Sequence, residues 1–106
     1  MNLYDKTCFK SAHLVARLYS TSFYISTRLL KRRHREVIFA VYGFVRFADE
    51  IVDTFHDTDQ RYLLLRLEED LKESLQRGIS MNPVLHSFQK TIHEYAIPYE
   101  LIDALT

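Results

Sequence analysis

The chain has 106 residues, 47% hydrophobic and 13% aromatic, which is enough for one small domain or for part of a larger one. Its 14 basic and 14 acidic residues give a formal net charge of zero, so overall charge argues neither for nucleic acid nor for a strongly acidic partner, and we expect no nucleic-acid partner. The single cysteine, Cys8, excludes an internal disulfide and a cysteine-based zinc cluster, as in proteins of the reducing cytoplasm. No apolar run approaches the roughly 20 residues needed to cross a bilayer, and the N-terminus lacks a signal-peptide core. We therefore expect a cytoplasmic protein that touches a membrane, if at all, from outside.

Helical periodicity runs along the whole chain, and no segment favours a strand. The first predicted helix covers residues 5–19, and the hydroxyl run 20–22 interrupts it, because such side chains compete for backbone hydrogen bonds. A second, short helix covers residues 23–30. The basic loop 31–33 then leads into a long helix that runs from residue 34 to about residue 55.

A fourth predicted helix begins at a cap at residue 57 or 58, carries a stripe of leucines, and ends at Gly78. Asparagine followed by proline at 82–83 opens a fifth helix, which extends to about residue 95. Pro98 opens a last helix, whose first turns have an apolar face and no C-cap signal before the chain ends. We therefore expect a truncated piece of a larger all-α bundle.

The long predicted helix carries a stripe of polar side chains. At about 100° per residue, Tyr42, Arg46, Asp49 and Asp53 fall within an arc of about 60°, with Glu50 at its flank. The other residues of this segment are nearly all apolar, and such a helix is normally buried on all sides. Because buried charges are costly unless they are paired or bound to a metal, we expect the stripe to face an internal polar cavity.

Asp49 and Asp53 lie one helical turn apart and could share a divalent cation. Mg²⁺ prefers oxygen ligands and is typically held by one or two carboxylates together with substrate phosphates, and Mn²⁺ is the alternative ion. Arg46, one turn earlier, could contact the same phosphate directly. The same spacing also occurs in ordinary salt-bridged stripes on solvated helix faces, so that interpretation stays open.

The chain resembles the squalene/phytoene synthase family, and most closely its bacterial phytoene and dehydrosqualene synthases. The resemblance rests on YSTSFY at 19–24, on Arg35, on AVYGFVRFADEIVD at 40–53, and on SMNPVLHSFQKTIHEYAIPYELIDAL at 80–105. It implies an all-α isoprenoid-synthase fold in which two D-x-x-x-D motifs face each other across a central cavity. Residues 1–106 would then be the N-terminal fragment of one such domain, carrying the first motif.

The resemblance also implies roles for individual residues. Asp49 and Asp53 would be the metal ligands, and together with Arg46 and Tyr42 they would form the catalytic set. The substrate-binding residues would be Ser20, Thr21, Ser22, Phe23, Tyr42 and Arg46. The motif reads D-E-x-x-D where many relatives have D-D-x-x-D, and we expect little effect because Glu50 lies off the ligand arc.

These roles imply a Mg²⁺-dependent prenyltransferase that joins two allylic prenyl diphosphates head to head. The leading hypothesis is phytoene synthase acting on two geranylgeranyl diphosphates, and the second is a dehydrosqualene- or squalene-type enzyme using farnesyl diphosphate. Two non-enzymatic hypotheses are a catalytically inactive helical scaffold and a small freestanding bundle with a binding role. With one aspartate-rich motif, we expect the chain to be inactive alone, and to self-associate through exposed apolar faces.

The basic run at 31–35 has two interpretations. It could contact anionic phospholipid or a diphosphate near the mouth of the cavity. It is also typical of a solvated loop and helix start, which is the commoner role of such runs.

Overall fold

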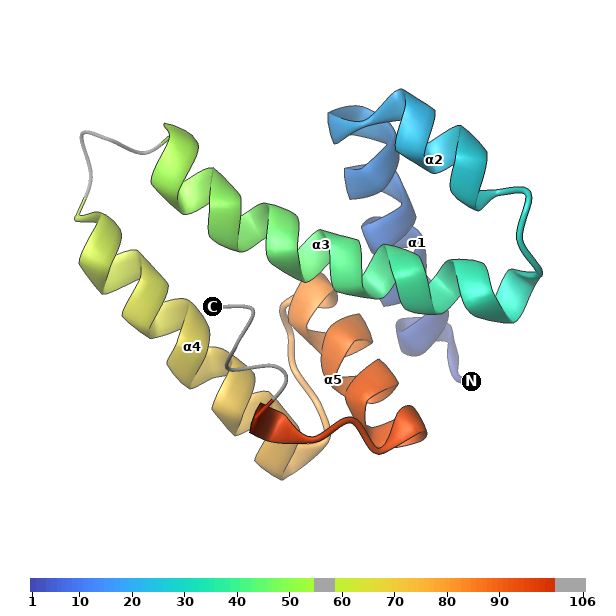
Figure 1. Cartoon of the computed structure of the whole chain (residues 1–106). Helices are drawn as coiled ribbons and strands as arrows, with labels where there is room; N and C mark the ends of the chain where they lie inside the picture. The colour runs from blue at the N-terminus through green and yellow to red at the C-terminus, as the bar shows by residue number, and fades with distance from the viewer. Residues whose placement is uncertain (55–58, 101–106) are drawn as a thin grey trace.

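In the computed structural model, residues 1–54 and 59–100 are described, and they form five α-helices (Figure 1). The helices are α1 (Leu3–Tyr19), α2 (Thr21–Thr27), α3 (Arg32–Thr54), α4 (Gln60–Arg77) and α5 (Pro83–Tyr95). These described residues contain no strand, so the predicted all-α class is confirmed. Within them, no helix combines the length and the apolar character that crossing a bilayer requires. The predicted last helix lies largely outside the described residues.

Two helix starts differ from the predictions because other side chains act as caps. Ser20 ends α1 and also caps α2, since its hydroxyl accepts a hydrogen bond from the backbone N–H of Phe23 at 3.3 Å. One residue therefore separates these helices, where we expected a longer interruption. Asp59, and not residue 57 or 58, caps α4, because its carboxylate accepts from the backbone N–H of Tyr62 at 3.0 Å.

The other boundaries follow the sequence signals more closely. α3 begins at Arg32, two residues before the predicted start, so most of the expected basic loop forms its first turn. Gly78 ends α4 in the left-handed region, with φ of 72°. Asn82 caps α5 by accepting from the backbone N–H of Val84 and Leu85, with a proline in the first turn as predicted.

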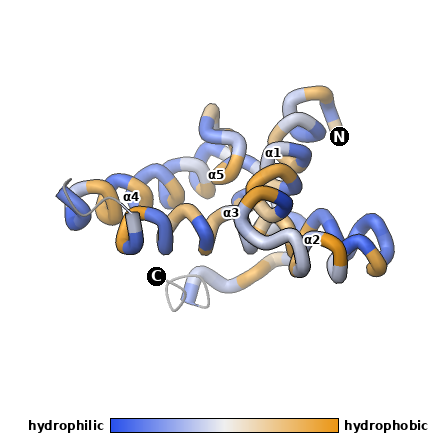
Figure 2. The backbone as a smooth tube through the Cα atoms, turned by 90° about the horizontal axis from the view of Figure 1, so that it is seen from above, coloured by the Kyte–Doolittle hydropathy of each residue, from blue (hydrophilic) through white to orange (hydrophobic). Residues whose placement is uncertain are grey.

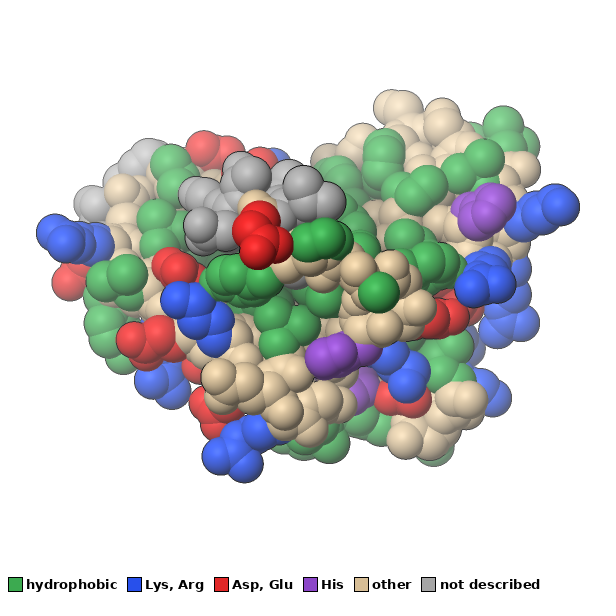
Figure 3. Space-filling model, turned by 60° about the horizontal axis from the view of Figure 1, so that its bottom comes forward, with side chains coloured by type: hydrophobic (Ala, Val, Ile, Leu, Met, Phe, Trp, Pro, Cys, Tyr) green, Lys and Arg blue, Asp and Glu red, His purple; other side chains and the backbone are tan. Residues whose placement is uncertain are grey.

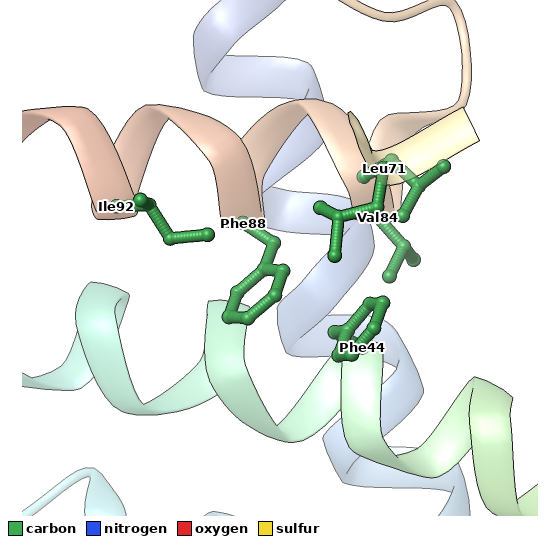
Figure 4. Packing of buried hydrophobic residues seen from close by; sticks show 6 residues of the cluster. Phe44, Leu71, Val84, Phe88 and Ile92 are labelled. Carbon is green, nitrogen blue, oxygen red and sulfur yellow. The ribbon is translucent and has the colours of Figure 1, made fainter. Parts of the chain in front are cut away.

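α1, α3 and α5 pack against one another, and α4 runs back from the end of α3 to cover part of α5 (Figure 1). The main core lies where these helices meet. There the rings of Phe44 and Phe88 stack with centroids 4.4 Å apart, and Leu71, Val84 and Ile92 close around them (Figure 4). This contact fixes the middle of α3, Val45 and Phe47 pack against it, and the last turns of the helix after Phe47 extend beyond the core.

Small residues allow α1 to approach α3 closely. Ala12 and Ala16 are fully buried and pack against Phe39 of α3. A Cβ atom at Gly43 would lie 3.7 Å from the Cβ of Ala12, which is ordinary van der Waals contact. Hydrophobic segments of α1 and α3 accordingly cross near the centre of Figure 2.

A buried polar network joins the first turn of α1 to α5. The backbone N–H of Ser80 donates to Nδ1 of His86 at 3.2 Å, so the ring proton lies on Nε2, which donates to Asp5 Oδ1 at 2.7 Å. Lys90 Nζ lies 3.3 Å from the other carboxylate oxygen. Burial disfavours the charged form of Asp5, but the hydrogen bonds from His86 and Lys90 outweigh it and hold its pKa below the ordinary value.

Candidate active site on α3

The polar stripe of α3 lies on an open surface of the described chain. The buried residues of α3 are Phe39, Ala40, Gly43 and Phe44, all in the middle of the helix. Asp49 is exposed, and the side chain of Asp53 is 64% exposed. Within the described residues, α3 is thus not buried all round, and the expected cavity that its stripe faces stays a prediction about the larger bundle. Asp53 follows Phe44 by nine residues, which at 100° per residue puts them about 180° apart on the helix.

Arg46 is the centre of the charged cluster. Its Nη2 atom lies 3.4 Å from Glu50 Oε2 and 3.3 Å from Asp53 Oδ2, and its side chain is 23% exposed. Its Nε is buried and has no hydrogen-bond partner among the described residues. Within residues 1–54 and 59–100, no hydrogen bond or ion pair engages the Asp49 carboxylate. The structure thus joins Arg46 to Asp53 and leaves Asp49 open to solvent.

Glu50 is a member of this cluster that helical periodicity alone did not select. Besides Arg46, it accepts a hydrogen bond of 2.6 Å from the hydroxyl of Thr54. The signal was present in the sequence, because Glu50 lies four residues after Arg46, a spacing at which ion pairs form on helices.

Tyr19, in the last turn of α1, brings a second helix to the cluster. The guanidinium carbon of Arg46 lies 5.1 Å from the centroid of the Tyr19 ring, a cation–π contact. Partial burial and the neighbouring Glu50 carboxylate raise the pKa of Tyr19. Sequence reasoning did not select Tyr19 as a site residue, although it begins the YSTSFY stretch.

The predicted substrate-binding residues in and just before α2 differ in their surroundings. Phe23 stacks on Tyr42 of α3, with ring centroids 4.7 Å apart and an interplanar angle of 23°. The hydroxyl of Ser20 is engaged as a helix cap, whereas Thr21 and Ser22 are exposed in the first turn of α2. Of the six predicted substrate-binding residues, Phe23 and Tyr42 therefore form an aromatic wall, and Thr21 and Ser22 are exposed to solvent.

The donor set of the stripe suits Mg²⁺ in the presence of a phosphate ligand. The described part of the chain contains no group of three or more His, Cys, Asp or Glu side chains that could hold a metal ion by themselves. Asp49 and Asp53 supply carboxylate oxygens one turn apart on an accessible face. Mg²⁺ is commonly held by one or two carboxylates, with phosphate and water completing its coordination. The residues therefore fit a Mg²⁺–phosphate complex better than a cation enclosed by protein alone.

Comparison with known proteins connects this geometry to a family. A family model described as squalene/phytoene synthase matches residues 16–106. The chain belongs to the squalene/phytoene synthase family. The matched range contains every candidate site residue, from Tyr19 to Asp53, and leaves the Asp5 end of the buried network outside it.

Two curated relatives are each 34% identical to the chain. The presqualene diphosphate synthase of Rhodopseudomonas palustris matches over 85 residues, which is 80% of this chain and 30% of that protein. The phytoene synthase of Rhodobacter capsulatus matches over 88 residues, 81% of this chain and 26% of that protein. The chain thus spans less than a third of the length of either relative. No solved structure matches it significantly.

Proposed function

We propose that this chain supplies the first metal- and diphosphate-binding helix of a prenyltransferase that condenses two geranylgeranyl diphosphates head to head into phytoene. One observation carries the proposal: Asp49 and Asp53 stand one turn apart beside Arg46, on an accessible face of the helix that the family match includes. This is the donor arrangement that a Mg²⁺–diphosphate substrate requires. The enzyme would act in the cytoplasm or at a membrane surface.

Each residue of the stripe has a separate task in this reaction. The Asp49 and Asp53 carboxylates would hold Mg²⁺, which supplies electrostatic stabilisation of the departing diphosphate when bound. Arg46 would exchange an ion pair with Glu50 or Asp53 for charge-assisted hydrogen bonds to the diphosphate oxygens.

The aromatic wall formed by Phe23 and Tyr42 would stabilise the allylic fragment from which the diphosphate departs. The stacked rings of Tyr42 and Phe23 offer π faces that tolerate positive charge on the allylic fragment and exclude water from it. Thr21 and Ser22, exposed at the start of α2, would donate hydroxyl hydrogen bonds to the second diphosphate.

Two other functions have specific support. A relative named presqualene diphosphate synthase favours a squalene-type enzyme that uses farnesyl diphosphate. The ion pairs of Arg46 with Glu50 and Asp53 are also what a non-catalytic scaffold with a salt-bridged α3 would contain. Measurements of ligand binding and of turnover separate these functions from the leading proposal.

The first experiment measures ligand binding by the chain itself. Calorimetric titration with inorganic pyrophosphate should give saturable binding that requires Mg²⁺, and the double variant Asp49→Asn/Asp53→Asn should weaken it at least about tenfold. The matched control is Glu69→Gln/Glu73→Gln, which removes two carboxylates with the same spacing from α4, one of them also paired with an arginine. Equal weakening by both double variants, or binding without Mg²⁺, would support the scaffold instead.

The second experiment measures turnover. A chimaera in which this chain replaces the matched segment of the Rhodobacter capsulatus phytoene synthase is offered C20 and C15 diphosphates separately, and products are separated by chromatography. We expect phytoene from the C20 substrate and loss of product in the Asp49→Asn chimaera. Product from the C15 substrate alone would establish the squalene-type function. A folded chimaera without any product would argue against a catalytic role for the stripe.

A further inference from the structure

The corner between α2 and α3 carries a dense group of positive charges. Residues 28–35, here called the basic corner, contain no carboxylate and five cationic side chains: Arg28, Lys31, Arg32, Arg33 and Arg35. Arg32 and Arg33 have side chains that are 77% and 71% exposed. Lys and Arg side chains gather at this end of the molecule in Figure 3, whereas the α4 end mixes both signs of charge.

Two exposed leucines form the tip of the basic corner. Leu29 is 86% exposed and Leu30 is 43% exposed, and Arg28 and Lys31 flank them directly. Ile25, in the preceding turn of α2, is also exposed. A single exposed leucine is common, but adjacent apolar side chains set among cations are typical of a surface that lies in a membrane interface.

A hollow beside the basic corner could receive phosphate groups. It has a volume of about 440 Å³, and Arg28, Arg32 and Arg35 line it together with Lys6 and Lys10 of α1. One carboxylate, Glu36, also lines the hollow, and it already pairs with Arg32 at 3.4 Å. The hollow therefore keeps a clear excess of positive charge.

We propose that the basic corner docks the chain onto a bilayer that contains anionic phospholipid. Leu29 and Leu30 enter the boundary between headgroups and acyl chains, while the cations of the corner and the hollow bind lipid phosphates. A nucleic acid would match the charge but not the leucines, which would stay in water against a polyanion.

The docking surface lies far from the candidate active site. The basic corner is at the start of α3 and at one edge of the molecule (Figure 1), whereas Asp53 is in the last turn of the same helix. Twenty-one residues separate Arg32 from Asp53, which at 1.5 Å per residue is about 30 Å. The proposal thus stands independently of the prenyltransferase function.

The test is co-sedimentation of the full 106-residue chain with vesicles. We expect strong binding to phosphatidylcholine vesicles that contain phosphatidylglycerol, weak binding to phosphatidylcholine alone, and a loss of binding as salt is added. Each basic residue near an anionic surface contributes about fivefold in partitioning, so Arg32→Gln/Arg33→Gln should bind about 30-fold more weakly. Leu29→Ser/Leu30→Ser should bind about tenfold more weakly.

Matched variants on α4 and in the segment between α4 and α5 control for charge and for exposed apolar surface. Arg66→Gln/Arg77→Gln removes the same charge from two arginines that pair with a carboxylate one turn away, as Arg32 does, whereas Arg33 pairs with Glu94 of α5 at 3.9 Å. Met81→Ser removes another highly exposed apolar side chain. Both should bind vesicles within about twofold of the unchanged chain. Circular dichroism should show the same helicity for all variants.

Four results would overturn the proposal. One is equal binding to both vesicle compositions, and another is equal weakening by the corner and α4 arginine variants. The third is unchanged binding of Leu29→Ser/Leu30→Ser, because it would show that the leucines do not enter the bilayer. Displacement of the chain from vesicles by a DNA duplex at equal phosphate concentration would assign the corner to nucleic acid instead.

Discussion

Glu50 holds Arg46, the central side chain of the charged stripe of α3, in the chain without any ligand. Its carboxylate is 21% exposed and accepts from both Arg46 and Thr54, so it holds Arg46 in place from the side opposite the open Asp49. In a D-E-x-x-D motif the glutamate is then a positioning residue, since its longer side chain reaches the guanidinium one turn back. The expectation that glutamate in place of a second aspartate has little effect on the motif stays a prediction.

A stability measurement tests this role of Glu50. Glu50→Gln removes the charge from a partly buried ion pair, and we expect it to lower the free energy of unfolding by about 1 kcal/mol. Asp49→Asn, which removes an exposed carboxylate on the same helix, should change it by less than about 0.5 kcal/mol. Urea unfolding followed by circular dichroism gives both values. Equal values for the two variants would contradict the assigned role.

Asp5 makes the stability of the fold sensitive to acid. Its pKa in the folded chain lies below the ordinary value of 3.8, so the folded state binds this proton less readily than the unfolded state. Its contribution to stability is therefore complete above pH 3.8 and is lost as the pH falls through the folded-state pKa. Unfolding measured from about pH 5 downward should show a steeper loss for the unchanged chain than for Asp5→Asn. Parallel curves for the two proteins would contradict this.

Site residues that lie on one helix could be predicted from the sequence, whereas contacts between helices could not. Asp49, Asp53 and Arg46 lie on one helix, so helical periodicity alone places them together. The contact of Tyr19 with Arg46 depends on how α1 crosses α3, and the Asp5–His86 hydrogen bond joins residues 81 positions apart. No local pattern reports either contact, because both arise from packing between helices.

At the scale of single helices, the two glycines should respond oppositely to alanine. Gly78 has φ of 72°, where an L side chain is strained, so Gly78→Ala should lower the free energy of unfolding by about 1 kcal/mol. At Gly43, inside α3, a new Cβ would meet its nearest neighbour, Val84 Cγ1, at 3.5 Å without a clash. Gly43→Ala should therefore raise stability by about 0.5–1 kcal/mol. Thermal unfolding of both variants checks the opposite signs.

Helix ends show where sequence rules succeed and where they compete. Gly78 and Asn82 were predictable because glycine past a helix and asparagine before a proline are strong signals. The prediction that Ser20 belongs to a longer interruption was wrong, since this one serine caps α2 directly at the end of α1. Asp59 caps α4 in place of two earlier candidates, and all three residue types favour that position.

At the scale of the whole molecule, the exposed apolar side chains of α4 should promote self-association. Leu64 and Leu65 are 36% and 50% exposed, although Leu67 and Leu75 of the same helix pack on the core. We expect the sedimentation coefficient of the chain to rise with concentration, and Leu65→Gln to reduce that rise. A concentration-independent monomer would contradict the prediction.

The open position of Asp49 and Asp53 marks the limit of sequence-based prediction at this scale. Periodicity identified which faces of α3 are apolar, and three apolar side chains of this helix, Phe39, Ala40 and Phe44, are buried in the described core. Periodicity does not predict which of these apolar faces pack against another helix within the 106 residues. Val52, for example, is half exposed although it continues the apolar pattern.

The bond between Asp5 and His86 also has a consequence for synthesis of the chain. α1 leaves the ribosome before α5, and the imidazole and the ammonium group that hold its aspartate are added only with α5. Until then the carboxylate has to stay hydrated, which keeps the first turn of α1 away from its final position. The nascent helices can form one by one, but the docking of α1 against α5 waits until α5 has been translated.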